Sequence, residues 1–494
     1  MLLTPITILV ILAVLLLFLL AFLLVRTATF GKSFDQVEPA EGLPVDMQVV
    51  AEHLAAAIRC ETYATGPADT PNRQGLLGLH RLLEGLYPRV HTTLKREVIN
   101  EFSLLYTWEG AQPALPGVLF MAHQDVVPVE PASLPDWTYP PYEGRIADGF
   151  VWGRGAIDIK NQVITLFEAV EGLLKDGYQP QRTIYLAFGH DEETLSGGGA
   201  EAIAALLQER MVTLAAVLDE GGTIVNGVVP GVKEPVAMIG TAEKGYLTLE
   251  LSVQGQPGHT ARPPEHTAIG VLAGALSRLE ASPMPAHIAA VRPLFKAIGV
   301  IAPFFTQMAF ANLWLFSGTV KRRLEANPGT NAAIRTTAAV SMIQAGLRDN
   351  VLPAQARAMV NYRLLTGDSI ATICDHVRQV IHDERVHFEC VEGKAWEASP
   401  ASPVDNLAFH CLETSTRKMF GNIPVAPYLI AGATDARKYV ALSENIYRYS
   451  PVVMEPADLD RMHGTNERIA VVALERMVKF YADLIPAWSE MQVA

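Results

Sequence analysis

Histidine and carboxylate residues follow three short apolar segments of the chain. The first segment ends at His123 and Asp125, the second at Glu192 and Glu193, and the third at Asp219. Imidazole nitrogen and carboxylate oxygen are ligands that zinc takes in proteins. The three segments are therefore candidates for building one metal centre.

Two other segments carry ligands of the same kind. A glycine-rich turn at residues 153–155 delivers Asp158 just before a helical pattern, and His463 stands in a polar loop near the C-terminus. The four cysteines are scattered and form no CxxC pair, so they indicate neither a thiolate metal site nor a disulfide scaffold. A metal centre in this chain would thus use histidines and carboxylates.

The elements that must position these residues are strands and helices in alternation. Residues 117–121, 183–188 and 214–218 have strand character, and apolar residues at helical spacing occupy 163–174. This alternation predicts an α/β fold with a mainly parallel central sheet covered on both faces. Ligands bind such sheets at the carboxyl ends of the strands, which is where the candidate ligands stand.

The pattern changes after Lys244, where apolar and polar residues alternate as in a half-exposed strand. The following segments have the order β-α-β-β-α-β, which is typical of a small two-layer α+β domain. We predict a catalytic domain made of residues 46–244 and 394–494, with an inserted lid and dimerisation domain at residues 245–393. An apolar stretch at residues 294–325 interrupts this insertion.

The N-terminus predicts a single-pass membrane anchor at residues 1–26 and a tether at residues 27–45. Residues 6–25 are apolar except for Thr7, and twenty helical residues span about 30 Å, the thickness of a bilayer core. A cleaved signal peptide would have a basic start and a shorter apolar run. Arg26 and Lys32 favour a cytoplasmic body, but two charges leave the membrane face open.

Chain length, net charge and the absence of certain motifs limit the classes of function that fit this sequence. With 494 residues, two or more domains are expected. The 39 Lys and Arg residues against 52 Asp and Glu residues give a net charge of -13, which argues against a nucleic-acid partner. The sequence has neither the GxSxG turn of many serine hydrolases nor the HExxH helix of zincins.

Taken in order, the HxD motif, GRGxxDxK, the Glu-Glu pair, the later Asp and the C-terminal His resemble a known family. It is the two-zinc metallopeptidase family of carboxypeptidase S, aminoacylase and glutamate carboxypeptidase, and the resemblance runs from about residue 47 to the end. Residues 311–316 and 348–353 are most similar to its carboxypeptidase S and N-fatty-acyl amino acid synthase/hydrolase branch.

The resemblance implies two zinc ions bridged by Asp158. His123 and Asp219 would complete the first zinc site, and Glu193 and His463 the second. Two metals a few ångströms apart activate water and polarise a scissile carbonyl. An amide bond beside a free carboxylate is the substrate that this family implies.

Asp125 and Glu192 have implied roles beside the metals. Asp125 would accept the other ring N–H of His123 and so fix its tautomer. Glu192 and Glu193 are adjacent, so in an extended segment they point in opposite directions, and one can bind metal while the other faces the substrate. Glu192 is therefore the predicted general base.

The insertion is expected to supply recognition. His259 resembles a lid histidine that reaches the partner subunit's active site and steadies the oxyanion, which implies a homodimer. Asn350 and Arg363 match residues that hold the substrate carboxylate, for which the planar fork of Arg is suited. Gly432 lies in a loop that resembles the lining of the same pocket. Trp314 is expected to pack within the lid.

Two readings of the substrate remain open. A carboxypeptidase or dipeptidase and an enzyme that forms and cleaves N-fatty-acyl amino acids would share this metal site, because both substrates are amides beside a carboxylate. The apolar run at residues 298–305 would suit an acyl chain, but it would also suit lid packing. A third reading, a non-catalytic membrane-tethered binding module, is disfavoured because all of the metal-ligand positions and Glu192 are present.

Overall fold

The three strands that precede the candidate ligands are neighbours in one ten-stranded sheet. The computed structural model describes residues 4–31, 36–40, 42–64, 72–194, 196–227 and 232–492. The sheet has the order β1 (Lys95–Ile99), β2 (Ser103–Trp108), β6 (Ile184–Gly189), β3 (Gly117–His123), β7 (Leu214–Asp219), β17 (Ile446–Arg448), β9 (Val236–Glu243), β8 (Ile224–Val225) and β18 (Val453–Met454), and β16 (Val425–Ile430) also pairs with β9. Because β6, β3, β7 and β17 run parallel, their carboxyl ends lie at the same edge.

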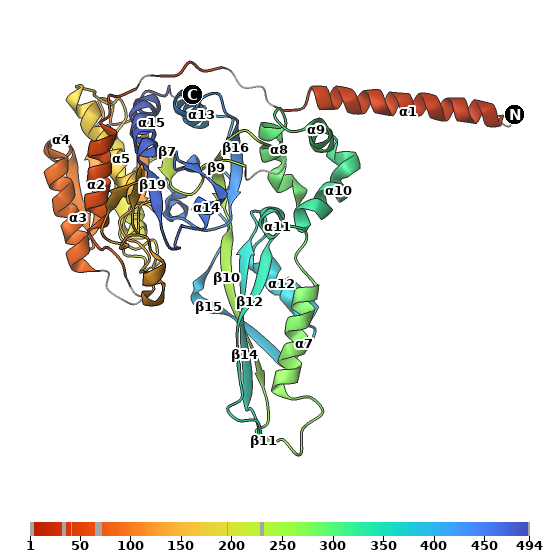
Figure 1. The fold of residues 1–494 in the computed structure, drawn as a ribbon. Coiled ribbons are helices and arrows are strands. Elements are labelled where there is room, and N and C mark those ends of the chain that lie inside the picture. Colours follow the sequence, from red (N-terminus) through yellow and green to blue (C-terminus); the bar gives the residue numbers. More distant parts are fainter. Residues whose placement is uncertain are drawn as a thin grey trace.

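Helices cover both faces of this sheet, as the alternating pattern predicts (Figure 1). In β3, Val118 and Phe120 enter one apolar cluster, whereas Leu119 and Met121 enter the other. The first cluster is built with α2 (Met47–Ile58), α3 (Arg73–Leu86), α4 (Pro88–Thr93), α5 (Lys160–Lys175), α13 (Leu407–Phe420) and α15 (Val471–Ser489). The second is built with α6 (Ala200–Glu209) and η3 (Asp435–Tyr439). Burial on both faces explains why these strands are apolar throughout instead of alternating.

Short elements complete the catalytic domain around the sheet. A three-stranded sheet joins β4 (Arg145–Ala147), β5 (Phe150–Trp152) and β19 (Arg468–Ala470). The remaining short helices are η1 (Pro131–Asp136) and α14 (Pro456–Leu459). Pairing of β19 with β5 brings the C-terminal loop of His463 beside the glycine-rich turn that precedes Asp158.

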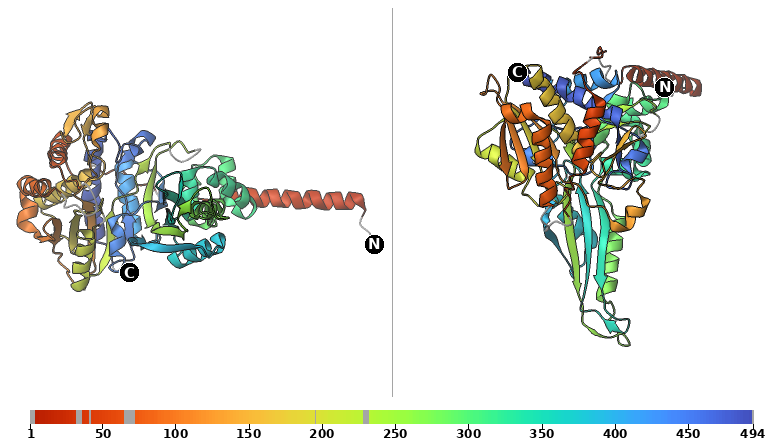
Figure 2. Two further views of the ribbon diagram at one scale, coloured as in Figure 1. Left: turned by 90° about the horizontal axis from the view of Figure 1, so that it is seen from below. Right: turned by 60° about the vertical axis from the view of Figure 1, so that its left-hand side comes forward.

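The β-α-β-β-α-β segment forms an elongated arm that points away from the central sheet (Figures 1 and 2). Its antiparallel sheet has the order β12 (Thr337–Ala345), β14 (Gln355–Leu364), β10 (Gly245–Gln254) and β15 (Val386–Trp396). The helices α7 (Ala268–Ala281) and α12 (Ile370–Ile381) pack on one face of it. At the tip of the arm, β11 (Gly258–His259) pairs with β13 (Val351–Leu352). The predicted order of elements is confirmed.

The apolar stretch that interrupts the arm belongs to a separate group of helices. It comprises η2 (Ile288–Val291), α8 (Arg292–Ile298), α9 (Phe304–Ala311), α10 (Leu313–Glu325) and α11 (Pro328–Ile334). Ile298 of α8 packs with Met238 and Ala426 of the central sheet. These helices therefore sit beside the catalytic domain and do not line the arm, and Trp314 is 56% exposed instead of packing within the lid as predicted.

The helix α1 (Pro5–Ala28) projects from this group of helices as an isolated rod (Figure 1). Only Leu23 and Thr27 of it are buried. The helix is long and apolar enough to cross a bilayer, although a signal sequence near an N-terminus has the same properties.

The segment predicted as a tether is partly bound to the catalytic domain. Val37 exchanges backbone hydrogen bonds with the Asn422 side chain, with N–O distances of 2.9 and 3.3 Å. Leu43 and Val45 pack on the main apolar cluster. Lys32, one of the two charges used to predict orientation, lies outside the described residues.

Candidate metal centre

His123 is the last residue of β3 and is almost fully buried. Its Nδ1 lies 2.9 Å from the backbone carbonyl of Asp125 and 3.5 Å from the Asp125 carboxylate. The Asp125 carboxylate accepts the backbone N–H groups of Glu192 and Glu193, at 3.3 and 3.0 Å. Asp125 therefore orients the imidazole mainly through its carbonyl, while its carboxylate holds the Glu-Glu pair in place, a role that the sequence did not predict.

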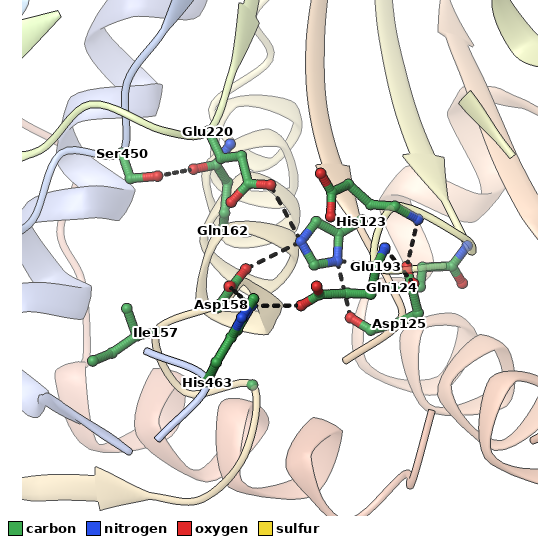
Figure 3. A network of polar contacts seen from close by, with 12 residues as sticks. His123, Gln124, Asp125, Ile157, Asp158, Gln162, Glu193, Glu220, Ser450 and His463 are labelled. Atoms are coloured by element: carbon green, nitrogen blue, oxygen red, sulfur yellow. Dashed lines mark hydrogen bonds and ion pairs between the residues drawn. The ribbon is translucent and has the colours of Figure 1, made fainter. Parts of the chain in front are cut away.

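Asp158 lies between the two candidate histidine ligands (Figure 3). Its Oδ1 is 3.1 Å from His123 Nε2 and its Oδ2 is 2.9 Å from His463 Nε2. Each carboxylate oxygen thus faces a different histidine, which is the arrangement expected of a carboxylate that bridges two metal ions.

Two further carboxylates flank these histidines. Glu193 Oε1 is 3.1 Å from His463 Nε2, and Glu220 Oε1 is 3.2 Å from His123 Nε2. Two groups of ligand atoms therefore lie within 4.8 Å of one another, one of His123, Asp158 and Glu220 and the other of Asp158, Glu193 and His463. The two groups share Asp158, so the structure presents a pair of adjoining three-residue sites.

Asp219, which the sequence placed in the first site, does not join it in this structure. Its Oδ2 accepts the backbone N–H of Ala436 at 2.7 Å, and Glu220 faces His123 in its place. Consecutive residues at a strand end point in opposite directions. The opposite directions of consecutive side chains, which separated the roles of Glu192 and Glu193, apply equally to Asp219 and Glu220. This alternation is the sequence signal that could have identified Glu220 as a candidate ligand.

A buried ion pair holds the two sites together from behind. Glu467, which is fully buried, accepts the backbone N–H groups of Ile157 and Asp158 at 2.7 and 3.1 Å. Arg154 Nη1 lies 2.6 Å from Glu467, and Arg154 Nη2 donates to the His463 carbonyl at 3.1 Å. Arg154 and Glu467 therefore fix the turn of Asp158 against the loop of His463. The sequence analysis predicted neither role, although Arg154 stands inside the GRGxxDxK motif and Glu467 follows His463 by four residues.

The charge of this cluster suits bound cations. Within the described part of the chain, the ion pairs of Asp158, Glu193 and Glu220 are all with the two histidines and none is with Lys or Arg. Burial, assisted by the charge of Asp158 and opposed by His123, raises the pKa of Glu220 to about 8. Hydrogen bonds to Asp158 and Glu193 raise the pKa of His463 to about 10. Three crowded carboxylates with no cationic side chain fit a dinuclear zinc site, since zinc binds histidine nitrogen and carboxylate oxygen.

Glu192 faces the same cluster. Its carboxylate, one from Glu193 and the imidazole of His123 have ligand atoms within 4.8 Å of one another. Burial raises the pKa of the Glu192 carboxyl well above its usual value, with the charge of Glu220 acting in the same direction and His123 against it. A partly buried carboxylate that faces a metal-type cluster can serve as a general base for water held there.

Two of the predicted recognition residues lie far from this cluster. His259 and Asn350 are exposed at the tip of the arm, where β11 pairs with β13 (Figure 1). The Asn350 carbonyl accepts the backbone N–H of Thr260. One chain by itself does not bring His259 and Asn350 to its own metal-type cluster.

Arg363 lies instead at the base of the arm. Its guanidinium lies over the Tyr246 ring, 4.5 Å from the ring centre, and Tyr246 stacks on Trp396 with ring centres 4.6 Å apart. The guanidinium of Arg437 lies over the Trp396 ring, 4.8 Å from its centre. Arg437 donates to the carbonyl of Thr434, in the loop that contains the exposed Gly432. Arg363 and Gly432 are thus linked to the junction between the arm and the central sheet.

Comparisons with known proteins agree on one family. Residues 119–487 match the peptidase family M20/M25/M40. The chain is 39% identical to the N-fatty-acyl-amino acid synthase/hydrolase of Xenopus tropicalis, over 94% of this chain and 92% of that protein. It is 32% identical to carboxypeptidase S of Saccharomyces cerevisiae, over 85% and 81% of the two chains.

The fold comparison agrees with the sequence relatives. An M20 family metallo-carboxypeptidase from Sulfolobus solfataricus superimposes with a TM-score of 0.63 at 15% identity, covering 90% of this chain and all of that one. Human carnosine dipeptidase 1 superimposes with a TM-score of 0.59 at 14% identity, over 91% of this chain. The chain belongs to the peptidase family M20/M25/M40, a family of metal-dependent amide hydrolases.

Proposed function

We propose that this protein uses two zinc ions to cleave an amide bond next to a free carboxylate. The observation that carries the proposal is the position of Asp158, with one oxygen facing each histidine. His123 and Glu220 would complete one site, and Glu193 and His463 the other. When bound, such a metal pair activates water and polarises the scissile carbonyl.

The side chains of this chain divide the remaining work. Glu192 takes the proton of the attacking water and delivers it to the leaving nitrogen, since Glu193 lies 3.1 Å from His463 Nε2 and takes the ligand position of the Glu-Glu pair. The Asp125 carboxylate keeps Glu192 in position by accepting the backbone N–H of Glu192. Arg363 binds the substrate carboxylate at the base of the arm, with Gly432 leaving room beside it.

His259 and Asn350 would act on a partner subunit in a homodimer. Both are exposed at the tip of the arm, distant from their own cluster. The arm also carries β12 at the edge of its sheet, with Met342 and Ile343 more than half exposed. An exposed apolar edge strand is a surface that pairs with another chain. A dimer formed through the arm would cover this strand and bring His259 to the other active site.

Within this chemistry, N-fatty-acyl amino acids are a second candidate substrate class beside short peptides. Relatives named for N-fatty-acyl-amino acid synthesis and hydrolysis are 36–39% identical to this chain, and relatives named carboxypeptidase S or carboxypeptidase S-like are 32–38% identical, so both substrate classes are represented. The apolar helix α1 favours a lipid-like substrate, because an enzyme retained at a bilayer meets acyl chains at high local concentration. Each methylene of such a chain contributes about 0.8 kcal/mol when buried.

The deciding experiment assays the full-length, zinc-loaded protein against matched dipeptides and N-acyl amino acids of increasing chain length. We expect hydrolysis of amides beside a free carboxylate and loss of hydrolysis when that carboxylate is esterified. A rise of kcat/KM with acyl length supports the lipid substrate, and faster cleavage of dipeptides supports the peptidase. No cleavage of either class after zinc loading would overturn the proposed function.

A further inference from the structure

The last turns of α1 are held in a socket made by α9 and α10. Asn312 is fully buried between these two helices, and its side-chain amide lies 3.4 Å from both the Leu23 carbonyl and Thr27 Oγ1. Arg26 donates to the Ala311 carbonyl at the end of α9, at 3.0 and 3.3 Å. These contacts join residues about 285 positions apart in sequence. The end of α1 is therefore a structural part of the folded body, which a segment removed during export would not be.

The rest of α1 lacks a protein partner in the described structure. Only 6% of its most apolar 18-residue window is buried. An exposed apolar rod of 24 residues spans roughly 36 Å, which matches a bilayer core of about 30 Å. If a bilayer covers the rod, the socket at its base lies at the membrane surface (Figure 1).

Aromatic and apolar side chains of the body are exposed beside this base. Trp314 lies 6.2 Å from Phe22, which is one helical turn further into the rod than Arg26. Trp314 is 56% exposed and its neighbour Leu315 is 46% exposed. Tryptophan is enriched at the boundary between lipid and water, so its depth beside Phe22 suits that layer.

The charge of this region is opposite to that of the whole chain. Residues 281–324 contain five Lys or Arg residues and no Asp or Glu, although the chain carries a net charge of -13. Arg26, Arg292 and Lys296 line a cavity of about 280 Å³ that Trp314 also borders. No carboxylate of the described residues forms an ion pair with Arg292 or Lys296. Such cations suit the phosphates of an anionic membrane surface.

We propose that the end of α1 and helices α8–α10 form a membrane seat, defined by Arg26, Arg292, Lys296, Trp314 and Leu315. Trp314 and Leu315 lie in the interfacial layer of the bilayer, and the three cations bind the phosphate of an anionic phospholipid. The seat orients the body beside the membrane instead of leaving it on a loose tether. It depends on retention of α1, and it does not depend on the chemistry of the metal centre.

The test measures depth in the bilayer with the full-length protein reconstituted in vesicles. In a chain with the exposed Cys390 replaced by Ser, an environment-sensitive thiol dye is attached through Leu315→Cys. The control is Leu347→Cys; Leu347 is 99% exposed in the loop that joins β12 to β13, the strand that pairs with β11. Doxyl quenchers placed near the lipid headgroups should quench the dye at 315 and leave the dye at 347 unaffected. Equal quenching at both positions, or N-terminal sequencing that finds α1 removed, overturns the proposal.

The choice of lipid is tested by moving the quencher between phosphatidylglycerol and phosphatidylcholine in mixed vesicles. The dye at 315 should be quenched more strongly by the anionic lipid, and Arg292→Gln with Lys296→Gln should reduce that preference by at most about fivefold per cation. The control Arg278→Gln with Arg357→Gln removes the same charge from the arm and should retain the preference. If inorganic phosphate at matched ionic strength abolishes the preference, or if the seat variant retains it, the lipid assignment is wrong.

Discussion

The metal-type cluster and the tip of the arm differ in how completely one chain builds them. The cluster draws His123, Asp158 and His463 from three distant segments into contacts of about 3 Å, and a buried Arg154–Glu467 pair supports it. The tip carries His259 and Asn350 exposed, with no contact to that cluster. The metal-type cluster is thus preorganised within one chain, whereas the proposed action of His259 and Asn350 on the substrate would need a second chain.

The largest effect is expected at the shared ligand. Asp158→Asn leaves each site with a neutral, weaker bridging group, so we expect loss of both metal ions and activity at the detection limit. Metal analysis and an amide hydrolysis assay check this. As a control, Asp176→Asn changes a carboxylate at the exposed end of α5 and should keep two metal ions and full activity. Retention of two metals in Asp158→Asn would mean that Asp158 is not the bridge.

Glu192→Gln should separate chemistry from metal binding. The substitution removes the proton acceptor and leaves all five proposed ligands, so kcat should fall by about 10²–10⁴-fold while metal content stays unchanged. Glu193→Gln is the matched control and should lower metal content. If Glu192→Gln loses metal and Glu193→Gln does not, the two adjacent carboxylates have exchanged roles.

His259→Ala tests whether the tip acts across a dimer. Loss of a group that steadies an oxyanion is expected to cost about 10²–10³-fold in kcat. Random exchange of subunits with Glu192→Gln should then restore activity to about a quarter of the wild-type level, because one site in each mixed C2 dimer has both groups. Verified exchange without recovery would show that His259 acts within its own chain or has no part in the reaction.

The smallest effect is expected from substitutions of Asp219 and Glu220 at the end of β7. Comparing the metal affinities of these two variants is also the sharpest test of the geometry. Glu220→Gln should weaken metal binding at the His123 site, by about 10–100-fold or more since outer-shell changes already reach that range. Asp219→Asn should retain two metals, because its carboxylate binds the Ala436 backbone instead. Competition with a chelating dye gives both affinities. The opposite ranking would restore Asp219 as the ligand.

Much of the catalytic domain follows from local sequence patterns. The strands β3, β6 and β7 begin and end within two residues of their predicted bounds, because strands buried on both faces need unbroken apolar runs. The order of elements in the arm also follows from the pattern, since half-exposed strands alternate and amphipathic helices repeat every three to four residues. The sequence motifs predicted His123, Asp158, Glu193 and His463 as metal ligands, and the structure brings these four residues together.

The remaining features depend on contacts between distant segments. Whether Asp219 or Glu220 faces His123 depends on the direction in which β7 ends, and a DE pair in the sequence is compatible with both. Glu467 becomes a support only because β19 pairs with β5 beside the turn of Asp158.

The sequence by itself determined the α/β class, the order of the inserted elements, the apolar N-terminal helix and the residue types of a metal centre, because each is written in local periodicity or in short motifs. Tertiary structure decided which carboxylate of a pair turns inward, how α1 docks through Asn312, and that helices α8–α10 leave the arm to sit at its base. The physical reason is that apolar residues show that a segment is covered, while only the packed chain shows what covers it.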